Sequence, residues 1–324
     1  MKIIEVKNGW KKEVLGVYFS VGNVCNYRCR YCFPGAHEGN HKFPNIDLIK
    51  KNTAHLLDQY LQKTNKKQFD IMFYGGEPTH WPYLGDYINF LKQNYNCLIS
   101  MVSNGSKDLN RWKSIALNLD RIQLSCHHEY VKIDQFVNLC DYLYEQNVIV
   151  SVSVMMDPAA WEKCLSLVDK LKKSKHKFTI RYAELIGEGI EYTLDQKQIL
   201  SKHRARGPNL FWFYKNNKYY KSRVIVVDDK NKKHKFKDNQ LLLERMNSFY
   251  GWECNLGVDW IAIDHNGDIQ GLCGQNPYEA KEKYNFRCEN FTKEFYPEIK
   301  PTICKNLTCN CVAETNMSKK KRLK

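Results

Sequence analysis

The stretch GNVCNYRCRYCFPG, residues 22–35, decides how this chain is interpreted. It places three cysteines, Cys25, Cys29 and Cys32, within eight positions. Two cysteines would be typical of a redox pair or a disulfide, and four would close a zinc or iron–sulfur site. Three indicate either a fourth ligand elsewhere, for which His37 or His41 is available, or a metal with one open coordination position. An open position distinguishes a catalytic metal site from a structural one.

The composition is that of a folded globular protein. Of its 324 residues, 43% are hydrophobic and 13% aromatic, enough for one large α/β domain with an appendage or for two domains. No apolar run approaches the roughly 18 to 20 residues of a membrane span, and residues 1–13 are unlike a signal peptide. We therefore expect a cytoplasmic protein with no membrane contact. In that compartment its 13 cysteines are better suited to metal binding than to disulfides.

The net charge of +15 has two interpretations. Lysine is spread along the whole chain, and a diffuse positive surface can serve solubility alone. Residues 202–237, however, form a basic segment that contains many lysines and arginines and only two acidic residues, Asp228 and Asp229. This segment could bind an acidic partner or a phosphate-bearing substrate, and the aromatic residues 211–214 beside it keep a nucleic-acid partner open.

The first 190 residues alternate short apolar runs with longer amphipathic ones. The apolar runs predict six strands, at residues 14–21, 69–74, 97–102, 121–125, 148–156 and 178–185. The amphipathic runs predict helices at 46–62, capped by Asn45, and at 83–93, 109–117, 133–145 and 159–173. This β-α repeat is typical of a parallel sheet covered by helices. Since six units fall short of the eight of a complete barrel, we expect an incomplete barrel or an open sheet.

Residues suited to ligand binding lie at the ends of the predicted strands or on them. After the three-cysteine loop come Gly75, Gly76, Glu77, Pro78, Ser103, Asn104, Ser125, Cys126, His127, His128 and Arg181. The carboxyl ends of parallel strands meet at one edge of the sheet, where ligands bind. The sequence therefore predicts a single site at this edge. His127 or His128 could move a proton there, or the pair could simply be solvated or cap a helix.

A second cysteine-rich pattern begins near residue 251. Alternating runs at 260–263 and 269–273 flank the turn Asn266-Gly267, which predicts a β-hairpin between Cys254 and Cys273. The hairpin would bring these two cysteines together, and Cys304, Cys309 and Cys311 follow. Two of those three could complete a second metal site with four thiolates, which suits zinc or an iron–sulfur cluster.

The three-cysteine loop, with Tyr31 directly before Cys32, resembles the signature of the radical S-adenosylmethionine (radical SAM) enzymes. Residues 74–78, Tyr-Gly-Gly-Glu-Pro, resemble the motif that holds the amino group of the methionine moiety in this family. The resemblance covers residues 14–186 and implies a partial (β/α)6 barrel. It also implies a [4Fe–4S] cluster that the three cysteines bind and that stays open to S-adenosylmethionine.

The family pattern implies further contacts to S-adenosylmethionine. Tyr31 would lie near the adenine, Ser103 and Asn104 along the ribose and methionine, and Ser125 near the carboxylate, with Arg181 on the same side. A small electron donor protein, a flavodoxin or a ferredoxin, would reduce the cluster. The cofactors would then generate a 5'-deoxyadenosyl radical, which abstracts hydrogen from the substrate.

The C-terminal cysteines resemble those of the auxiliary-cluster modules called twitch and SPASM. The resemblance implies a small α+β module with a hairpin and a cysteine cluster. Its ligands would be Cys254, Cys273 and two of Cys304, Cys309 and Cys311, which favours one auxiliary iron–sulfur cluster over two. We expect a radical SAM core at 1–186, a basic and aromatic insertion or linker at 187–250, and this module at 251–324.

The predicted function is a radical SAM enzyme of the iron–sulfur oxidoreductase or maturase type. Its substrate would be a peptide side chain or a small molecule such as a sugar or an alcohol. Two alternatives stay open. One is a radical SAM enzyme that modifies RNA, favoured only by the basic segment. The other is a non-catalytic protein that holds structural zinc at both cysteine sets.

Overall fold

The computed structural model describes residues 2–7, 12–32, 35–40, 43–185, 189–203, 213–215, 218–220, 224–236, 240–278, 282–309 and 317–322. The chain divides into two compact units. The first consists of Met1–Phe19, Pro44–Asp70 and Arg206–Lys324, and the second of Ser20–Phe43 and Ile71–Ala205. No helix in the described parts of the chain is long and apolar enough to cross a membrane.

The second unit is a mixed α/β structure built on a parallel sheet. Its strands follow the order β3 (Gln68–Tyr74, within this unit from Ile71), β4 (Cys97–Ser103), β5 (Arg121–Cys126), β6 (Ile149–Met156) and β7 (Thr179–Glu184). β4 to β7 pair in parallel. The helices are α2 (Leu84–Asn94), α3 (Leu109–Ala116), α4 (Ile133–Glu145), α5 (Trp161–Lys172) and α6 (Leu194–His203), with the 3-10 turns η1 (Pro78–His80) and η2 (Pro158–Ala160).

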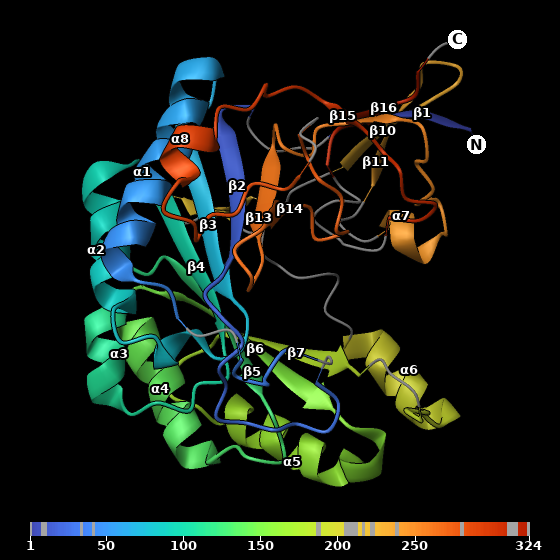
Figure 1. Ribbon diagram of the computed structural model, residues 1–324. Coiled ribbons are helices and arrows are strands. Elements are labelled where there is room, and N and C mark those ends of the chain that lie inside the picture. The colour runs from blue at the N-terminus through green and yellow to red at the C-terminus, as the bar shows by residue number, and fades with distance from the viewer. Residues whose placement is uncertain are drawn as a thin grey trace. The chain divides into compact units, whose positions relative to one another are not determined.

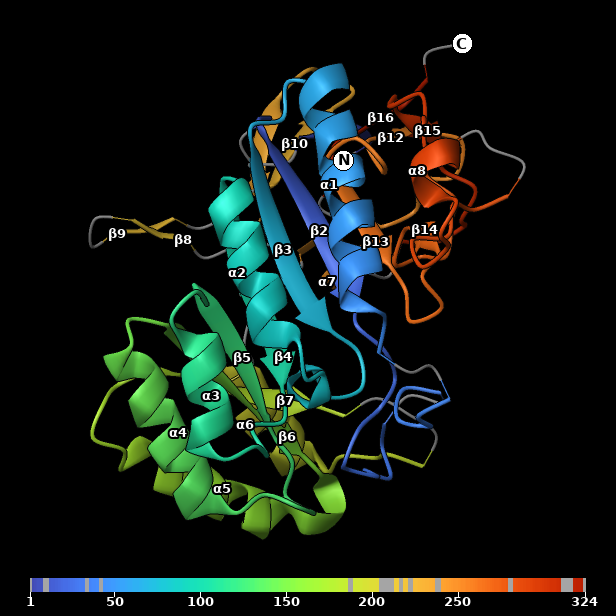
Figure 2. The same ribbon diagram turned by 60° about the vertical axis from the view of Figure 1, so that its left-hand side comes forward.

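The two faces of this sheet differ in polarity. Figures 1 and 2 show α2 to α5 along one face. Cys126 of β5 belongs to that face, because, in addition to burial, its charge raises the pKa of Cys140 in α4 and the charge of Cys164 in α5 raises its own pKa. Since side chains alternate along a strand, Ser125 belongs to the opposite face, as does Ser153, with which it is in register. Polar residues on that face are unusual for a parallel sheet, which is normally apolar on both sides.

The first unit contains a helix-covered strand pair and the predicted hairpin. β13 (Trp260–Ile263) pairs in parallel with β2 (Val14–Ser20) and antiparallel with β14 (Ile269–Gln270). A Cβ on Gly16 of β2 would lie 1.7 Å from the Trp260 ring, so only glycine leaves space for that indole. α1 (Ile46–Lys63) and the short α8 (Phe291–Glu294) belong to the same unit. The antiparallel pairing of β13 with β14 confirms the predicted hairpin.

A second sheet of the first unit joins distant parts of the chain. Its order is β11 (Lys233–Phe236), β10 (Val224–Asp228), β1 (Ile3–Lys7), β16 (Lys319–Lys320), β12 (Glu253–Cys254) and β15 (Thr302–Ile303). All of these strands pair antiparallel. β8 (Phe213–Lys215) and β9 (Lys218–Tyr220) form a separate hairpin, and α7 (Gln240–Leu243) follows β11. β12, β15 and β16 thereby bring Cys254 near the end of the chain.

Apart from β1, the strands of the first 190 residues and the helices up to residue 173 were predictable because their signals are local. Asn45 caps α1 as predicted, since its Oδ1 accepts hydrogen bonds from Asp47 N at 3.0 Å and Leu48 N at 3.1 Å. β1 was not predicted. Of the basic segment, residues 204–212, 216–217, 221–223 and 237 lie outside the described residues.

Candidate functional site

The three-cysteine loop of the second unit follows β2 and carries Cys25, Cys29 and Cys32. Cys29 is buried, Cys25 is half-buried and Cys32 is exposed. Cys32 N donates to Cys29 O at 3.0 Å, which folds the loop into a tight turn. Burial, followed by the charges of Glu129 and Cys32, raises the pKa of the Cys29 thiol to about 12. Such a thiol becomes a good ligand when a metal displaces its proton.

The glycines of the next motif pack against this loop. Gly75 and Gly76 have φ values of 87° and 28°, which other residues rarely adopt. A Cβ on Gly76 would lie 2.3 Å from the Val24 carbonyl oxygen, and one on Gly75 would lie 2.2 Å from Ser20 Oγ. Glu77 N donates to Val24 O at 2.8 Å. In this structure the space left by the missing side chains is therefore occupied by the chain itself.

The Glu77 carboxylate connects two strand ends. It is only 1% exposed and accepts hydrogen bonds from Thr79 N (3.1 Å), Thr79 Oγ1 (2.6 Å), Ser103 Oγ (2.7 Å) and Asn104 N (2.6 Å). Burial raises its pKa, although these hydrogen bonds act in the opposite direction. Asn104 Nδ2 in turn lies 3.8 Å from Cys25 Sγ. Of the predicted residues, Gly75, Gly76, Glu77 and Asn104 thus adjoin the cysteine loop. Ser103 is linked to the loop through Glu77, and Pro78 begins η1 directly after it.

His127, at the end of β5, contacts the same loop. Its Nδ1 lies 3.4 Å from Cys29 Sγ and 3.1 Å from the Tyr31 hydroxyl. The ring stacks on Tyr31 with 12° between the planes and meets Tyr27 edge-on at 83°. Burial, then the neighbouring His128, lowers the pKa of His127 to about 4. The sequence places His127 at the correct edge of the sheet but gives no signal for these partners.

Asp157, at the end of β6, holds the loop from another side. This fully buried carboxylate contacts the Arg30 guanidinium, accepts from Ala159 N at 2.9 Å and lies 2.9 Å from His128 Nε2. Burial alone would raise the pKa of Asp157, but these hydrogen bonds outweigh it and lower the pKa. Arg30 lies between Cys29 and Tyr31, so the pair fixes the loop to the sheet.

Ser125 and Arg181 share the sheet face opposite the helices. Ser125 is in register with Ser153, and Ser153 with Arg181. Arg181 donates from Nη1 to Gln123 Oε1 at 2.9 Å, and burial lowers its pKa to about 10. Ser153 is 2% exposed, and its hydroxyl has no hydrogen-bond partner among the described residues. The face therefore presents a buried cation beside hydroxyl groups.

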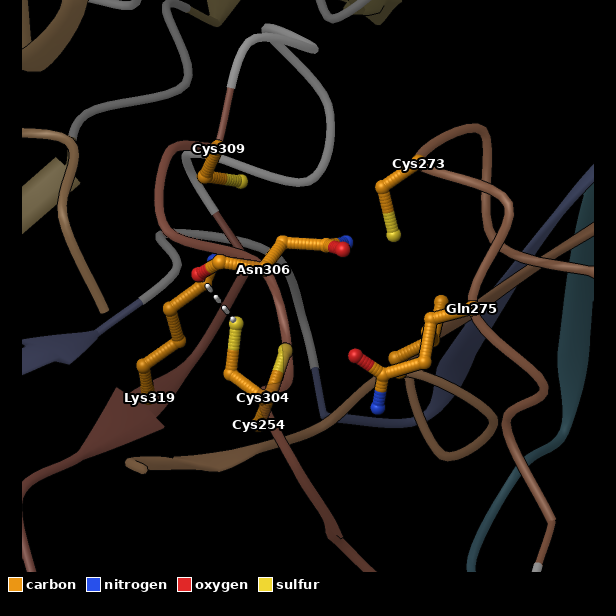
Figure 3. Close-up of a pocket in the computed structure, with 8 residues that line it drawn as sticks. Cys254, Cys273, Gln275, Cys304, Asn306, Cys309 and Lys319 are labelled. Atoms are coloured by element: carbon orange, nitrogen blue, oxygen red, sulfur yellow. Dashed lines mark hydrogen bonds between the residues drawn. The ribbon is translucent and has the colours of Figure 1, made fainter. Parts of the chain in front are cut away.

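The first unit contains a four-thiol pocket, lined by Cys254, Leu256, Cys273, Gln275, Cys304, Asn306, Cys309 and Lys319. In Figure 3 the sulfur atoms of Cys273, Cys304 and Cys309 point toward the same space. Cys309 is held by Asn247, whose side chain donates to Cys309 O at 2.9 Å and whose carbonyl accepts from Cys309 N at 2.9 Å. Cys304 N donates to Trp252 O at 2.8 Å. Cys311 lies outside the described residues.

Neither thiol set has the geometry of a single-ion site. Within the described ranges, no three His, Cys, Asp or Glu side chains are placed to hold one metal ion. A tetrahedral zinc with Zn–S bonds of about 2.3 Å would need its thiolates roughly 3.8 Å apart. The thiolates of a [4Fe–4S] cluster stand further apart because each binds a different iron. Thiolates suit both zinc and iron–sulfur clusters.

Comparisons with known proteins bear on the family of the chain and on its fold. The Radical SAM superfamily model matches residues 19–195, more than half of the chain. GTP 3',8-cyclase of Photorhabdus laumondii subsp. laumondii is 28% identical over 129 residues, 37% of this chain and 36% of that protein. Radical SAM cyclopropyl synthase TigE of Paramaledivibacter caminithermalis is 26% identical over 110 residues, 29% of this chain and 23% of that protein. The chain thus matches well under half the length of either relative.

A solved structure shows the same fold over most of the chain. It is histidine-tagged anSMEcpe with bound AdoMet, with a TM-score of 0.51 and 13% sequence identity. The match covers 87% of this chain and 82% of that one. At this identity the likeness concerns the fold alone.

Proposed function

Because the chain belongs to the radical SAM superfamily, we propose that Cys25, Cys29 and Cys32 bind a [4Fe–4S] cluster with one iron open to S-adenosylmethionine. The family implies both cofactors. The observation that carries the proposal is local: three thiols share one loop, and Glu77 and Asn104 connect the neighbouring strand ends to it. When bound, the two cofactors supply a 5'-deoxyadenosyl radical that abstracts hydrogen from the substrate.

The chain's own residues would orient S-adenosylmethionine. Its carboxylate would lie against the polar sheet face, where Arg181 offers a guanidinium and Ser125 a hydroxyl. Its amino group would contact backbone carbonyls of the Gly75-Gly76 segment, since the Glu77 carboxylate already accepts four hydrogen bonds from the chain. Tyr31 would lie along the adenine, and Ser103 and Asn104 along the ribose and methionine.

The four-thiol pocket would hold an auxiliary iron–sulfur cluster, as in twitch and SPASM modules. Four cysteines that line one pocket support a metal group bound by thiolates there, and the resemblance to these modules favours an iron–sulfur cluster over structural zinc. The described residues offer Cys254, Cys273, Cys304 and Cys309 as the ligands. The proposed domain organisation is a core at 1–186, a linker at 187–250 and this module at 251–324.

The proposed activity is of the oxidoreductase or maturase type, on a peptide side chain or on a sugar or alcohol. Radical SAM enzymes generally need a reductant, and a flavodoxin or ferredoxin is the proposed donor. The RNA-modifying alternative rests on the basic segment, much of which lies outside the described residues.

Iron and acid-labile sulfide analysis on anaerobically purified protein tests this proposal. We expect about eight irons per chain for two clusters, and about four in a variant with Cys25, Cys29 and Cys32 all replaced by Ala. That variant should form no 5'-deoxyadenosine from S-adenosylmethionine and dithionite. The exposed Cys288, outside both sets, gives the control Cys288→Ala, which should keep the full iron content. Bound zinc without sulfide would overturn the proposal.

A further inference from the structure

The ring of His127 is fixed in a defined orientation beside one cluster ligand. Tyr31 stacks on it at 5.8 Å between ring centroids, and Tyr27 meets it edge-on at 5.9 Å. Tyr27 is itself stacked on Tyr130 at 4.8 Å. These contacts direct Nδ1 toward Cys29 Sγ, which lies 3.4 Å away. His127 thus contacts the Cys29 thiol of the loop.

The chemistry of the two atoms determines which one donates. A cluster-bound cysteine has no proton, so its sulfur can only accept a hydrogen bond. The Tyr31 hydroxyl, 3.1 Å from the same nitrogen, carries its own proton and can turn it elsewhere. An N–H bond to an anionic acceptor is also stronger than one to a neutral hydroxyl. The arrangement in which Nδ1–H points at the thiolate is therefore favoured once iron is bound.

We propose that His127 is a positioning residue that donates a hydrogen bond from Nδ1 to the Cys29 thiolate and thereby sets the reduction potential of the cluster. This inference rests on the proposed cluster at Cys25, Cys29 and Cys32. Hydrogen bonds to cluster sulfurs stabilise the reduced form, which carries more negative charge, and so raise the potential. His127 thus makes the cluster easier to reduce by an external donor.

Three substitutions separate the donor from the bulk of the ring. His127→Asn keeps an amide N–H near the position of Nδ1, whereas His127→Gln moves it toward the position of Nε2. His127→Phe keeps the stacking on Tyr31 and removes the donor. His176→Phe is the matched control, because His176 also stacks on a tyrosine, Tyr144, with 16° between the planes.

The measurement is the midpoint potential of the reconstituted cluster, followed by electron paramagnetic resonance during a redox titration. The relevant signal is the one that changes when S-adenosylmethionine is added, which distinguishes this cluster from an auxiliary one. We expect more negative potentials for His127→Phe and His127→Gln, and values near wild type for His127→Asn and His176→Phe. Pulsed resonance in D2O should detect an exchangeable deuteron near the reduced cluster, lost in His127→Phe and kept in His127→Asn.

The outcomes distinguish this inference from the proposed function. A wild-type chain without an iron signal that responds to S-adenosylmethionine would overturn both. A wild-type cluster whose potential and deuteron coupling match those of the Phe and Gln variants would overturn the role of His127 alone. If the Phe variant fails to assemble a cluster, the comparison of Asn with Gln decides, since equal potentials for these two would contradict a donor at Nδ1.

Discussion

The two thiol sets are built in opposite ways. The three-cysteine loop takes its thiols from eight consecutive residues, and one of them, Cys32, is exposed. The four-thiol pocket takes its thiols from Cys254 to Cys309, and all but Cys273 are buried. A short loop with an exposed edge suits a metal site that must admit a second molecule, whereas a closed pocket suits one that needs only its own ligands. This contrast fits the proposed roles, in which the three-cysteine loop binds the cluster that S-adenosylmethionine reaches and the four-thiol pocket holds an auxiliary one.

Removing one ligand from each set should give the largest contrast. Cys29→Ala should lower 5'-deoxyadenosine formation by more than about 100-fold, since losing even an outer-shell partner costs about 10–100-fold at a metal site. Cys304→Ala should lose iron but still cleave S-adenosylmethionine when no substrate is present. The measurement is chromatographic quantification of 5'-deoxyadenosine, normalised to folded protein. If both variants lost S-adenosylmethionine cleavage equally, the proposal that only the three-cysteine loop supports this cleavage would be wrong.

A second contrast uses one glycine beside each site. Gly76→Ala places a Cβ 2.3 Å from the Val24 carbonyl, whereas Gly274→Ala, with φ of 79°, meets nothing within 4 Å. The second change should cost only about 1–2 kcal/mol for the left-handed backbone. The first adds a clash with backbone that must shift, so we expect a larger loss, about 3 kcal/mol or more, together with loss of iron from the three-cysteine loop. Denaturant unfolding and iron analysis measure both, and equal destabilisation would show that the loop can move aside.

The smallest expected effect on stability concerns Asp157, the carboxylate that holds the three-cysteine loop. The described lining of the four-thiol pocket contains no carboxylate. Asp157→Asn keeps the shape but weakens the contact with Arg30 and should cost about 1–3 kcal/mol. Because the folded pKa of Asp157 is lowered, its charge stabilises the fold above the unfolded pKa of about 3.9 and this contribution disappears as pH falls toward the folded value. Urea unfolding at pH 7 and below about pH 4 should therefore show a gap between wild type and variant that narrows in acid. A gap independent of pH would exclude the carboxylate's charge as its cause.

What the sequence could predict depends on how local each signal is. The alternation of strands and helices and the Asn45 cap depend on residues adjacent in sequence, and the structure contains both. β1 was missed because its partners, β10 and β16, lie more than 200 residues away. The contact between Cys29 and His127 spans 98 positions, so only the edge of the sheet, and not the partner, could be anticipated.

Two further residues show where motif reasoning stops. The resemblance of residues 74–78 implies a contact to an amino group, and the sequence gives no sign that the Glu77 carboxylate also accepts hydrogen bonds from Thr79, Ser103 and Asn104. The sequence left two of Cys304, Cys309 and Cys311 open as ligands, and spacing alone could not show that Asn247 holds Cys309 at the pocket. Both outcomes depend on side-chain packing between segments distant in sequence.

The pairing of β1 with β10 and β16 has a consequence for the order in which the molecule is made. Every residue of the second unit, including the three-cysteine loop, has been synthesised when the ribosome reaches Ala205. The sheet that carries Cys254 also needs Lys319 and Lys320 of β16, which emerge more than 100 residues later. Since such long-range pairings form slowly and domains fold as they emerge, the second unit with its three-cysteine loop can fold before β16 is synthesised, whereas the sheet that carries Cys254 is incomplete until then.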